Sequence, residues 1–198
     1  MSEEVHPFSI SVTEDQISDL KSRLNATRWP DQIPDSGWDY GCDQVWLKDL
    51  AAYWADEFDW RSVESRLNSF NHFLTEIDDQ NFHFIHQRSP HEEALPLVLN
   101  HGWPGSVTEF LEVIEPLTDP VPFGGDPSDA FHVIAPSLPG YGWSEPPREK
   151  GWGVNRTASA LVTLMSRLGY EKYGVQGGDW GSMVSRHMAH LDQDRVVG

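Results

Sequence analysis

The sequence predicts an α/β protein in two parts, a helical N-terminal segment (residues 1–75) and a strand-and-helix region (residues 76–198). Apolar residues recur at helical spacing in the first part. From Phe73 they recur at every second residue, and apolar strands then alternate with amphipathic helices. This alternation is typical of a parallel sheet covered by helices. A chain of 198 residues is long enough for one ordinary hydrophobic core.

Three amphipathic helices are predicted in the first part. Thr13 begins a capping-box sequence, and the helix after it must end before Pro30 because proline pushes its preceding residue out of the α region. A second helix carries Trp46 and Trp54 on one face, and Asp59 can cap a third. We interpret these apolar faces as packing surfaces rather than binding sites.

The second part contains a predicted hairpin, and strands and helices follow it in turn. The hairpin covers residues 73–86 and turns at the polar residues 78–81. Buried strands are expected where apolar residues form continuous runs, at residues 95–99, 131–135 and 173–176. Helices are expected between these strands, one starting at Ser106 and one ending at Gly169.

Composition and charge exclude several classes of partner. A formal net charge of −17 repels phosphate backbones and anionic membranes, so nucleic-acid and lipid-surface partners are not expected. Cys42 is the only cysteine, which fits a reducing compartment, and no Cys/His spacing suggests a metal site. No apolar run is long enough for a membrane span, and the N-terminus lacks the pattern of a signal peptide. We therefore expect a soluble cytoplasmic protein.

Glycine-rich loops follow three of the predicted strands, at residues 101–105, 136–142 and 177–181. Reacting groups in open α/β sheets collect at the carboxyl ends of the strands. The third loop places Asp179 between small residues and before a helix, which is the pattern of a nucleophile elbow with Asp in place of Ser. A carboxylate is ionised at neutral pH and suits displacement at an electrophilic sp³ carbon. The alternative is that Asp179 only caps the helix.

The first and third loops together favour chemistry at Asp179. In this architecture a developing oxyanion is bound by one N–H from an early loop and one from the residue after the nucleophile. These are the main-chain N–H groups of Trp103 and Trp180.

The chain resembles the epoxide hydrolases of the α/β-hydrolase fold in three motifs: HGWPGS at 101–106, PGYG at 139–142 and GDWG at 178–181. Haloalkane dehalogenases share the Asp-Trp elbow. The N-terminal half of the chain resembles the N-terminal extension of the microsomal type in RWPD at 28–31, YW at 53–54, FDWR at 58–61 and HFIH at 83–86. The resemblance implies an α/β-hydrolase sheet that is incomplete and stops just after the elbow.

The resemblance also implies a mechanism, in which Asp179 opens a small-molecule epoxide and forms an ester. The oxyanion hole would be Trp103 and Trp180, within an oxyanion loop that includes His101, Gly102 and Pro104. An activated water would release a vicinal diol without any metal or organic cofactor, a reaction used in detoxification. We expect His101 to hold its loop by side-chain hydrogen bonds rather than to act as the base.

The family's catalytic His, its relay acid and two lid tyrosines lie beyond the elbow helix, after which this sequence ends. We therefore expect a fragment of an epoxide hydrolase that does not turn over alone, and self-association through an exposed sheet edge. Two alternatives stay open. One is a haloalkane dehalogenase that uses the same Asp179, and the other is a truncated, non-catalytic binding protein.

Overall fold

The computed structural model describes residues 4–198, which fall into two compact units. One unit consists of residues 4–9 and 67–198, and the other of residues 10–66. The larger unit carries the sheet and the Asp179 loop. The domain boundary expected between residues 75 and 76 stays a prediction, because a division into compact units does not show where one evolutionary domain ends and the next begins.

The smaller unit contains helices α1 (Glu14–Asn25) and α2 (Gln44–Asp56) and nearly all of α3 (Trp60–Leu67). The capping box at Thr13 is present, since its side chain accepts from the Gln16 N–H and the Gln16 side chain accepts from the Thr13 N–H. Arg61 donates to the Val12 carbonyl (2.8 Å) and forms ion pairs with Glu14 and Glu64. These contacts tie α3 to the start of α1 within this unit.

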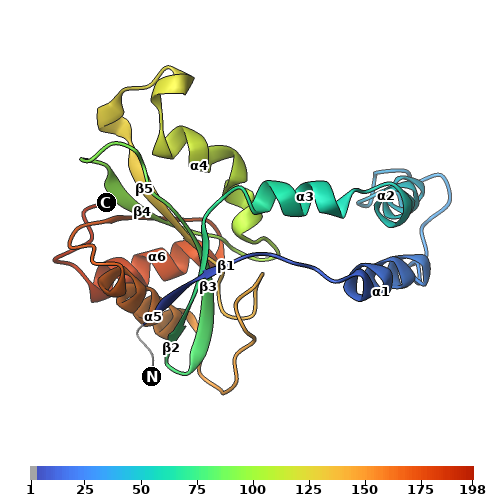
Figure 1. The fold of residues 1–198 in the computed structure, drawn as a ribbon. Coiled ribbons are helices and arrows are strands. Elements are labelled where there is room, and N and C mark those ends of the chain that lie inside the picture. Colours follow the sequence, from blue (N-terminus) through green and yellow to red (C-terminus); the bar gives the residue numbers. More distant parts are fainter. Residues whose placement is uncertain (1–3) are drawn as a thin grey trace. The chain divides into compact units, whose positions relative to one another are not determined.

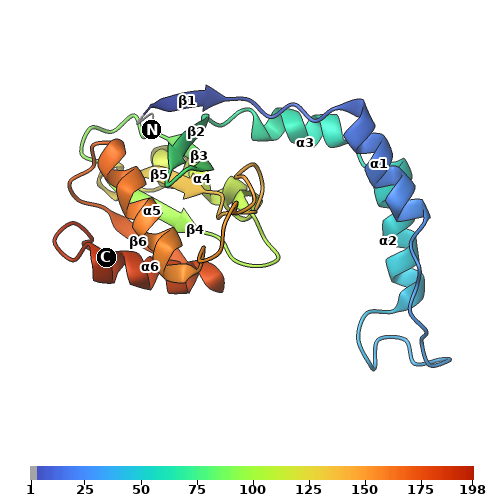
Figure 2. The same cartoon turned by 90° about the horizontal axis from the view of Figure 1, so that it is seen from below.

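The larger unit is built on one mixed sheet whose strand order is β1-β2-β3-β5-β4-β6 (Figures 1 and 2). Its strands are β1 (Val5–Phe8), β2 (His72–Ile77), β3 (Gln80–Gln87), β4 (Leu95–Asn100), β5 (Phe131–Pro136) and β6 (Gly174–Gly177). Strands β5, β4 and β6 are parallel, and β1, β2, β3 and β5 pair antiparallel.

Two features of this sheet differ from the sequence prediction. The sequence indicated a parallel sheet, whereas the sheet is mixed, because β3 pairs antiparallel with β5 and so joins the predicted hairpin to the parallel strands. Strand β1 was not predicted, since four residues that include a proline carry little strand signal. Its position at an edge of the sheet is one that tolerates Pro7.

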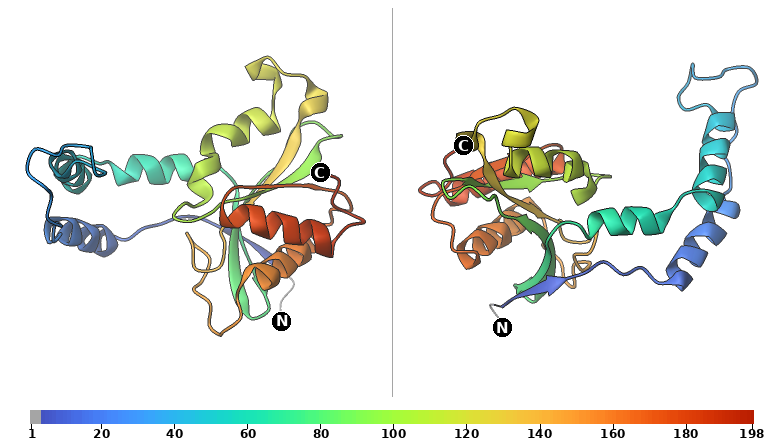
Figure 3. Two further views of the ribbon diagram at one scale, coloured as in Figure 1. Left: turned by 180° about the vertical axis from the view of Figure 1, so that it is seen from behind. Right: turned by 45° about the horizontal axis from the view of Figure 1, so that its top comes forward.

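Helices cover both faces of the sheet. Helices α5 (Val154–Arg167) and α6 (Trp180–Leu191) pack side by side on one face, against a core that includes Phe84 and Val98 (Figure 3). Helix α4 (Leu111–Thr118) covers the other face through Ile114, which packs with Leu99 and Val133. Val98 and Leu99 are consecutive in β4 and pack into the cores on opposite faces of the sheet, as expected for a strand buried on both faces.

Short 3-10 helices complete the connections, at Val107–Phe110, Val121–Phe123 and Pro127–Asp129. The helix predicted to start at Ser106 begins with the first of these, and α4 follows at Leu111. Residues 195–198 run beside β6, where the Val175 N–H donates to the Gly198 carbonyl (2.8 Å). None of the helices in residues 4–198 has the length and apolar character needed to cross a membrane.

Candidate active site

Asp179 stands in a strained turn between β6 and α6. Its backbone lies at φ 50° and ψ −123°, in the left-handed half of conformational space that residues with a Cβ avoid. Such strain costs about 1–3 kcal/mol and persists only where the surroundings impose it. The Asp179 side chain makes no capping hydrogen bond to α6 within the described chain, so a helix cap does not explain this residue.

Two main-chain N–H groups hold the Asp179 carboxylate instead. The N–H of Trp103 donates to Oδ1 at 2.8 Å, and the N–H of Trp180 donates to the same carboxylate. These bonds, that from Trp103 first, lower the pKa of Asp179 below its ordinary value, because each donor favours the charged form. The exposed carboxylate is thus kept ionised and oriented by the two residues that the sequence indicated as oxyanion donors.

Three glycines allow neighbouring segments to pack closely around this turn. A Cβ on Gly102 would lie 2.5 Å from the Cβ of Asp179, and one on Gly181 would lie 2.0 Å from the carbonyl oxygen of Asn100. A Cβ on Gly177 would lie 2.3 Å from the main chain of Gly181. No side chain fits at these distances, so glycine at all three positions lets the oxyanion loop, the elbow and α6 meet.

His101 links the oxyanion loop to the loop after β5. It is buried, and its Nε2 accepts from the N–H of Leu138 (3.1 Å) while its Nδ1 donates to the carbonyl of Gly102 (3.1 Å). Burial lowers its pKa, so the ring is neutral. Both ring nitrogens have main-chain partners, which leaves neither free to take a proton from water. Its neighbour Pro104 follows Trp103 through a cis peptide bond.

A second set of polar contacts holds the loop after β5, and no sequence pattern predicted these contacts. His83 Nδ1 accepts from the hydroxyl of Ser137 (2.9 Å), and His72 Nδ1 accepts from His83 Nε2 (2.9 Å). His72 Nε2 then donates to the carbonyl of Leu67 (2.7 Å). All three side chains are buried, and burial lowers the pKa of His83 to about 3. This series of hydrogen bonds between neutral groups holds the loop after β5 against the hairpin of β2 and β3.

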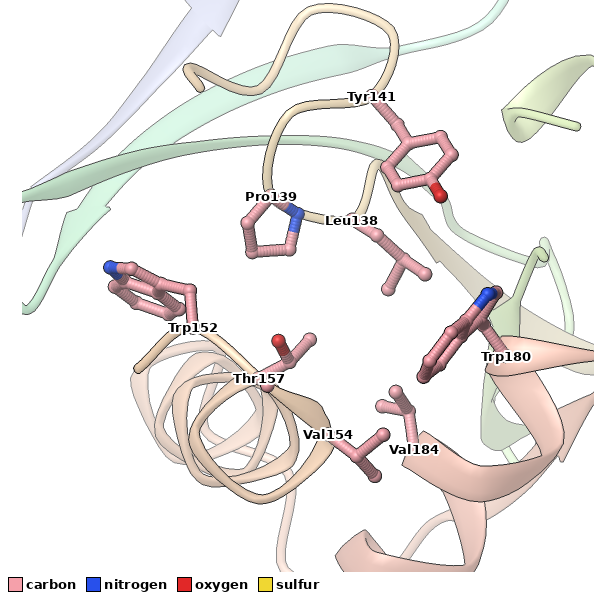
Figure 4. Close-up of a pocket in the computed structure, with 9 residues that line it drawn as sticks. Leu138, Pro139, Tyr141, Trp152, Val154, Thr157, Trp180 and Val184 are labelled. Atoms are coloured by element: carbon pink, nitrogen blue, oxygen red, sulfur yellow. The ribbon is translucent and has the colours of Figure 1, made fainter. Parts of the chain in front are cut away.

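A pocket of about 220 Å³ opens beside the elbow (Figure 4). Leu138, Thr157 and Val184 are its buried residues, from the loop after β5, α5 and α6 respectively. Trp152 and Trp180 line the pocket from opposite sides. Helix α5 and the residues before it were not predicted to contribute to a site, because residues 147–153 carry no motif.

Two further observations concern the His and acidic side chains of the described residues. No histidine in residues 4–198 hydrogen-bonds to Asp179, and His187 on α6 instead contacts the carbonyl of Met183 (2.9 Å). No group of three or more His, Cys, Asp or Glu side chains suited to a metal ion occurs in the same residues.

A strained Asp turn, two main-chain donors to its carboxylate and a sheet covered by helices on both faces are typical of the α/β-hydrolase fold. Comparison with known families agrees, because residues 96–198 match the α/β-hydrolase fold and residues 5–110 match the family described as the epoxide hydrolase N terminus. The chain belongs to the epoxide hydrolase family. The fold class and the family resemblance predicted from the sequence are confirmed.

Named relatives cover almost the whole chain. Epoxide hydrolase 1 of Oryctolagus cuniculus is 39% identical over 99% of this chain and 44% of its own length. The crystal structure of juvenile hormone epoxide hydrolase from Bombyx mori has a TM-score of 0.87 at 36% identity, covering 98% of this chain and 46% of that one. The structure of Aspergillus niger epoxide hydrolase has a TM-score of 0.85 at 36% identity, covering 98% and 51%. The chain thus spans about half the length of these relatives.

Proposed function

We propose that the chain carries the nucleophilic half of an epoxide hydrolase site, with Asp179 as the nucleophile. A carboxylate oxygen of Asp179 attacks a ring carbon of the epoxide, and the C–O bond of the ring breaks. The ring oxygen leaves as an alkoxide and takes a proton from an acid, so that a hydroxyalkyl ester of Asp179 remains. The observation that carries this proposal is the strained Asp179 backbone, with its carboxylate bound by the N–H groups of Trp103 and Trp180.

The same two donors suit the second step. Water adds to the carbonyl carbon of the ester, and negative charge develops on the carbonyl oxygen that Trp103 and Trp180 can bind. Collapse of this intermediate breaks the ester bond, releases a vicinal diol and restores the carboxylate. Because both donors already bind the ground-state carboxylate, Trp103 at 2.8 Å, little reorganisation is needed for the oxyanion.

The acid and the base for these steps are part of the proposal. By family resemblance they are two lid tyrosines and a His with a relay acid, and we place them in the part of the relatives that this chain does not span. The 198-residue chain alone is then expected to form the ester at most and not to turn over. A cytoplasmic location, a role in detoxification and self-association through a sheet edge stay predictions from the sequence.

Two other functions remain as alternatives. A haloalkane dehalogenase would use Asp179 on a carbon–halogen bond, but the match of residues 5–110 to the epoxide hydrolase N terminus favours the epoxide. A non-catalytic protein would bind an epoxide-like ligand in the pocket beside Trp180 without forming an ester.

Product analysis separates the three functions. Protein purified from its natural source is incubated with a terminal epoxide and, separately, with a chloroalkane of the same length. Diol formation that Asp179→Ser abolishes is the expected result, whereas halide release without diol would establish the dehalogenase. Near-normal diol formation by Asp179→Ser would remove Asp179 from the mechanism, and more than one diol per molecule of the 198-residue chain would contradict our placement of the base.

A further inference from the structure

Asn100 lies at the end of β4, immediately before the oxyanion loop, and it contacts two successive turns of α6. Its main-chain carbonyl oxygen faces Gly181, where a Cβ would come within 2.0 Å of it. Its side-chain Nδ2 donates to the hydroxyl of Ser185 (2.9 Å), one turn further along the helix. Asn100 therefore joins the segment that carries Trp103 to the helix that follows Asp179.

The hydrogen bond from the Trp103 N–H to Asp179 Oδ1 (2.8 Å) depends on how these two segments are spaced. It joins residues 76 positions apart in the sequence, whereas the other donor, Trp180, is the immediate neighbour of Asp179 and moves with it. The Trp103 bond is also the larger of the two causes that lower the pKa of Asp179. A shift of α6 relative to β4 would therefore weaken the Trp103 bond first.

Packing alone does not explain an asparagine at this position. The residue is fully buried, and its Oδ1 has no hydrogen-bond partner among residues 4–198. A buried acceptor without a partner costs stability, and an apolar side chain of similar size would avoid that cost. The second contact of Nδ2, with Met188 Sδ at 3.6 Å, is weak because a thioether is a poor acceptor. The hydrogen bond to Ser185 is thus the contact that an apolar residue could not replace.

We propose that Asn100 is a positioning residue that, through its hydrogen bond to Ser185, sets the distance between the Trp103 N–H and the Asp179 carboxylate. The inference rests on the proposed function, in which the same N–H also binds the oxyanion of the ester. Asn100 is buried against α6 and acts through other residues, not on the substrate itself. The spacing matters for the chemistry, because a misplacement of about 1 Å in an active site can cost on the order of 100-fold in rate.

Hydrogen exchange of the Trp103 N–H tests this at neutral pH and without substrate. The full chain is transferred to heavy water, and the exchange of each main-chain N–H is followed by NMR. Asn100→Leu should speed exchange of the Trp103 N–H by about 2- to 10-fold, the worth of a net hydrogen bond. It should leave the urea midpoint of unfolding at or above that of the wild type, because it removes the unpartnered Oδ1. Asp179→Ala gives the exchange rate of the same N–H without its acceptor.

Two further variants make the test specific. Ser185→Ala removes the same hydrogen bond from the side of α6 and should speed the Trp103 exchange to a similar extent. The double variant with Asn100→Leu should exceed neither single variant, because both remove one shared contact. Val98→Ala is the matched control, since Val98 is a buried core residue of the same strand that packs by apolar contact alone. It should lower the urea midpoint and leave the Trp103 exchange unchanged.

Unchanged Trp103 exchange in Asn100→Leu and Ser185→Ala would overturn the inference, whatever happens to the urea midpoint. Equal acceleration in Val98→Ala would also overturn it, because general loosening of the core would then account for the effect. Formation of the Asp179 ester is measured separately on the wild-type protein. Ester with unchanged exchange in the variants refutes this inference alone, and accelerated exchange without ester refutes the proposed function alone.

Discussion

Asp179 combines a strained backbone with a carboxylate that is exposed and fully oriented. The turn aims the side chain at the N–H of Trp103 and at the first N–H of α6, that of Trp180, whereas a helix cap binds N–H groups one or two residues further into the helix. Gly102 leaves room for this, since its missing Cβ is the space that the Asp179 side chain occupies. The strain therefore fits a role in positioning the carboxylate for reaction.

The ionisation of Asp179 predicts how its reactivity depends on pH. Hydrogen bonds from Trp103 and Trp180 lower its pKa below 3.8, so the carboxylate stays charged as the pH falls from about 8 to about 5. The rate of ester formation on Asp179, measured by mass spectrometry after quenching, should be constant over this range. Epoxide incubated with Asp179→Asn gives the rate of solvent-driven opening for subtraction. A rate that falls steadily between about pH 7 and about pH 5 would show that another group controls the step.

Helix α6 and strand β4 meet at a contact that only glycine permits. Gly181 would place a Cβ 2.0 Å from the main-chain oxygen of Asn100, and backbone cannot move aside cheaply. Gly181→Ala should therefore destabilise the protein by about 1–3 kcal/mol, even though alanine favours a helix by up to about 1 kcal/mol over glycine. The urea midpoint of unfolding measures this change.

Gly178→Ala is the matched control, because a Cβ there meets nothing within 4 Å and Gly178 does not have positive φ. It should leave the urea midpoint close to that of the wild type. Equal midpoints for Gly178→Ala and Gly181→Ala would contradict the close packing of α6 on β4.

Sequence patterns predicted most elements but not how they join. Continuous apolar runs located β4 and β5, and the Thr13 capping box located α1, because these signals are local. The pairing of β3 with β5 was missed, since register and partner depend on contacts between distant residues.

The residues of the candidate site were likewise predicted only where a local motif marks them. Asp179, Trp103 and Trp180 carry a motif, and the structure brings them together. The buried contacts of His72, His83 and Ser137 were not predicted, although His83 lies in the HFIH motif, because they arise only from burial and from neighbours distant in the sequence.

Across the whole molecule, buried neutral histidines make stability depend on pH. Burial lowers the pKa of His83 to about 3 and that of His86 to about 4, and it also lowers the pKa of His72. In the unfolded chain these groups take up protons as the pH falls through 6.5, while the folded chain does not. Stability is therefore full above about pH 6.5 and is lost as the pH falls from there toward 4, by up to about 1.4 kcal/mol per pH unit for each histidine.

Urea unfolding at about pH 7 and about pH 5 tests this prediction. His86→Gln removes one titrating group and keeps a side chain able to bond the Tyr170 hydroxyl, which His86 contacts at 2.8 Å. Its loss of stability between the two pH values should be smaller than that of the wild type. His190→Gln changes an exposed histidine and should behave as the wild type. Identical pH dependence in all three proteins would rule out His86 as a contributor.

The measurement that most directly tests Asp179 as the nucleophile is the location of the covalent adduct. Protein isolated from its natural source is mixed with a small excess of a terminal epoxide, quenched in acid and digested for peptide mass spectrometry. We predict one added epoxide mass on the peptide that contains Asp179, and none on that peptide in Asp179→Asn. An adduct confined to other nucleophiles such as Cys42, or equal labelling of the two proteins, would contradict the account.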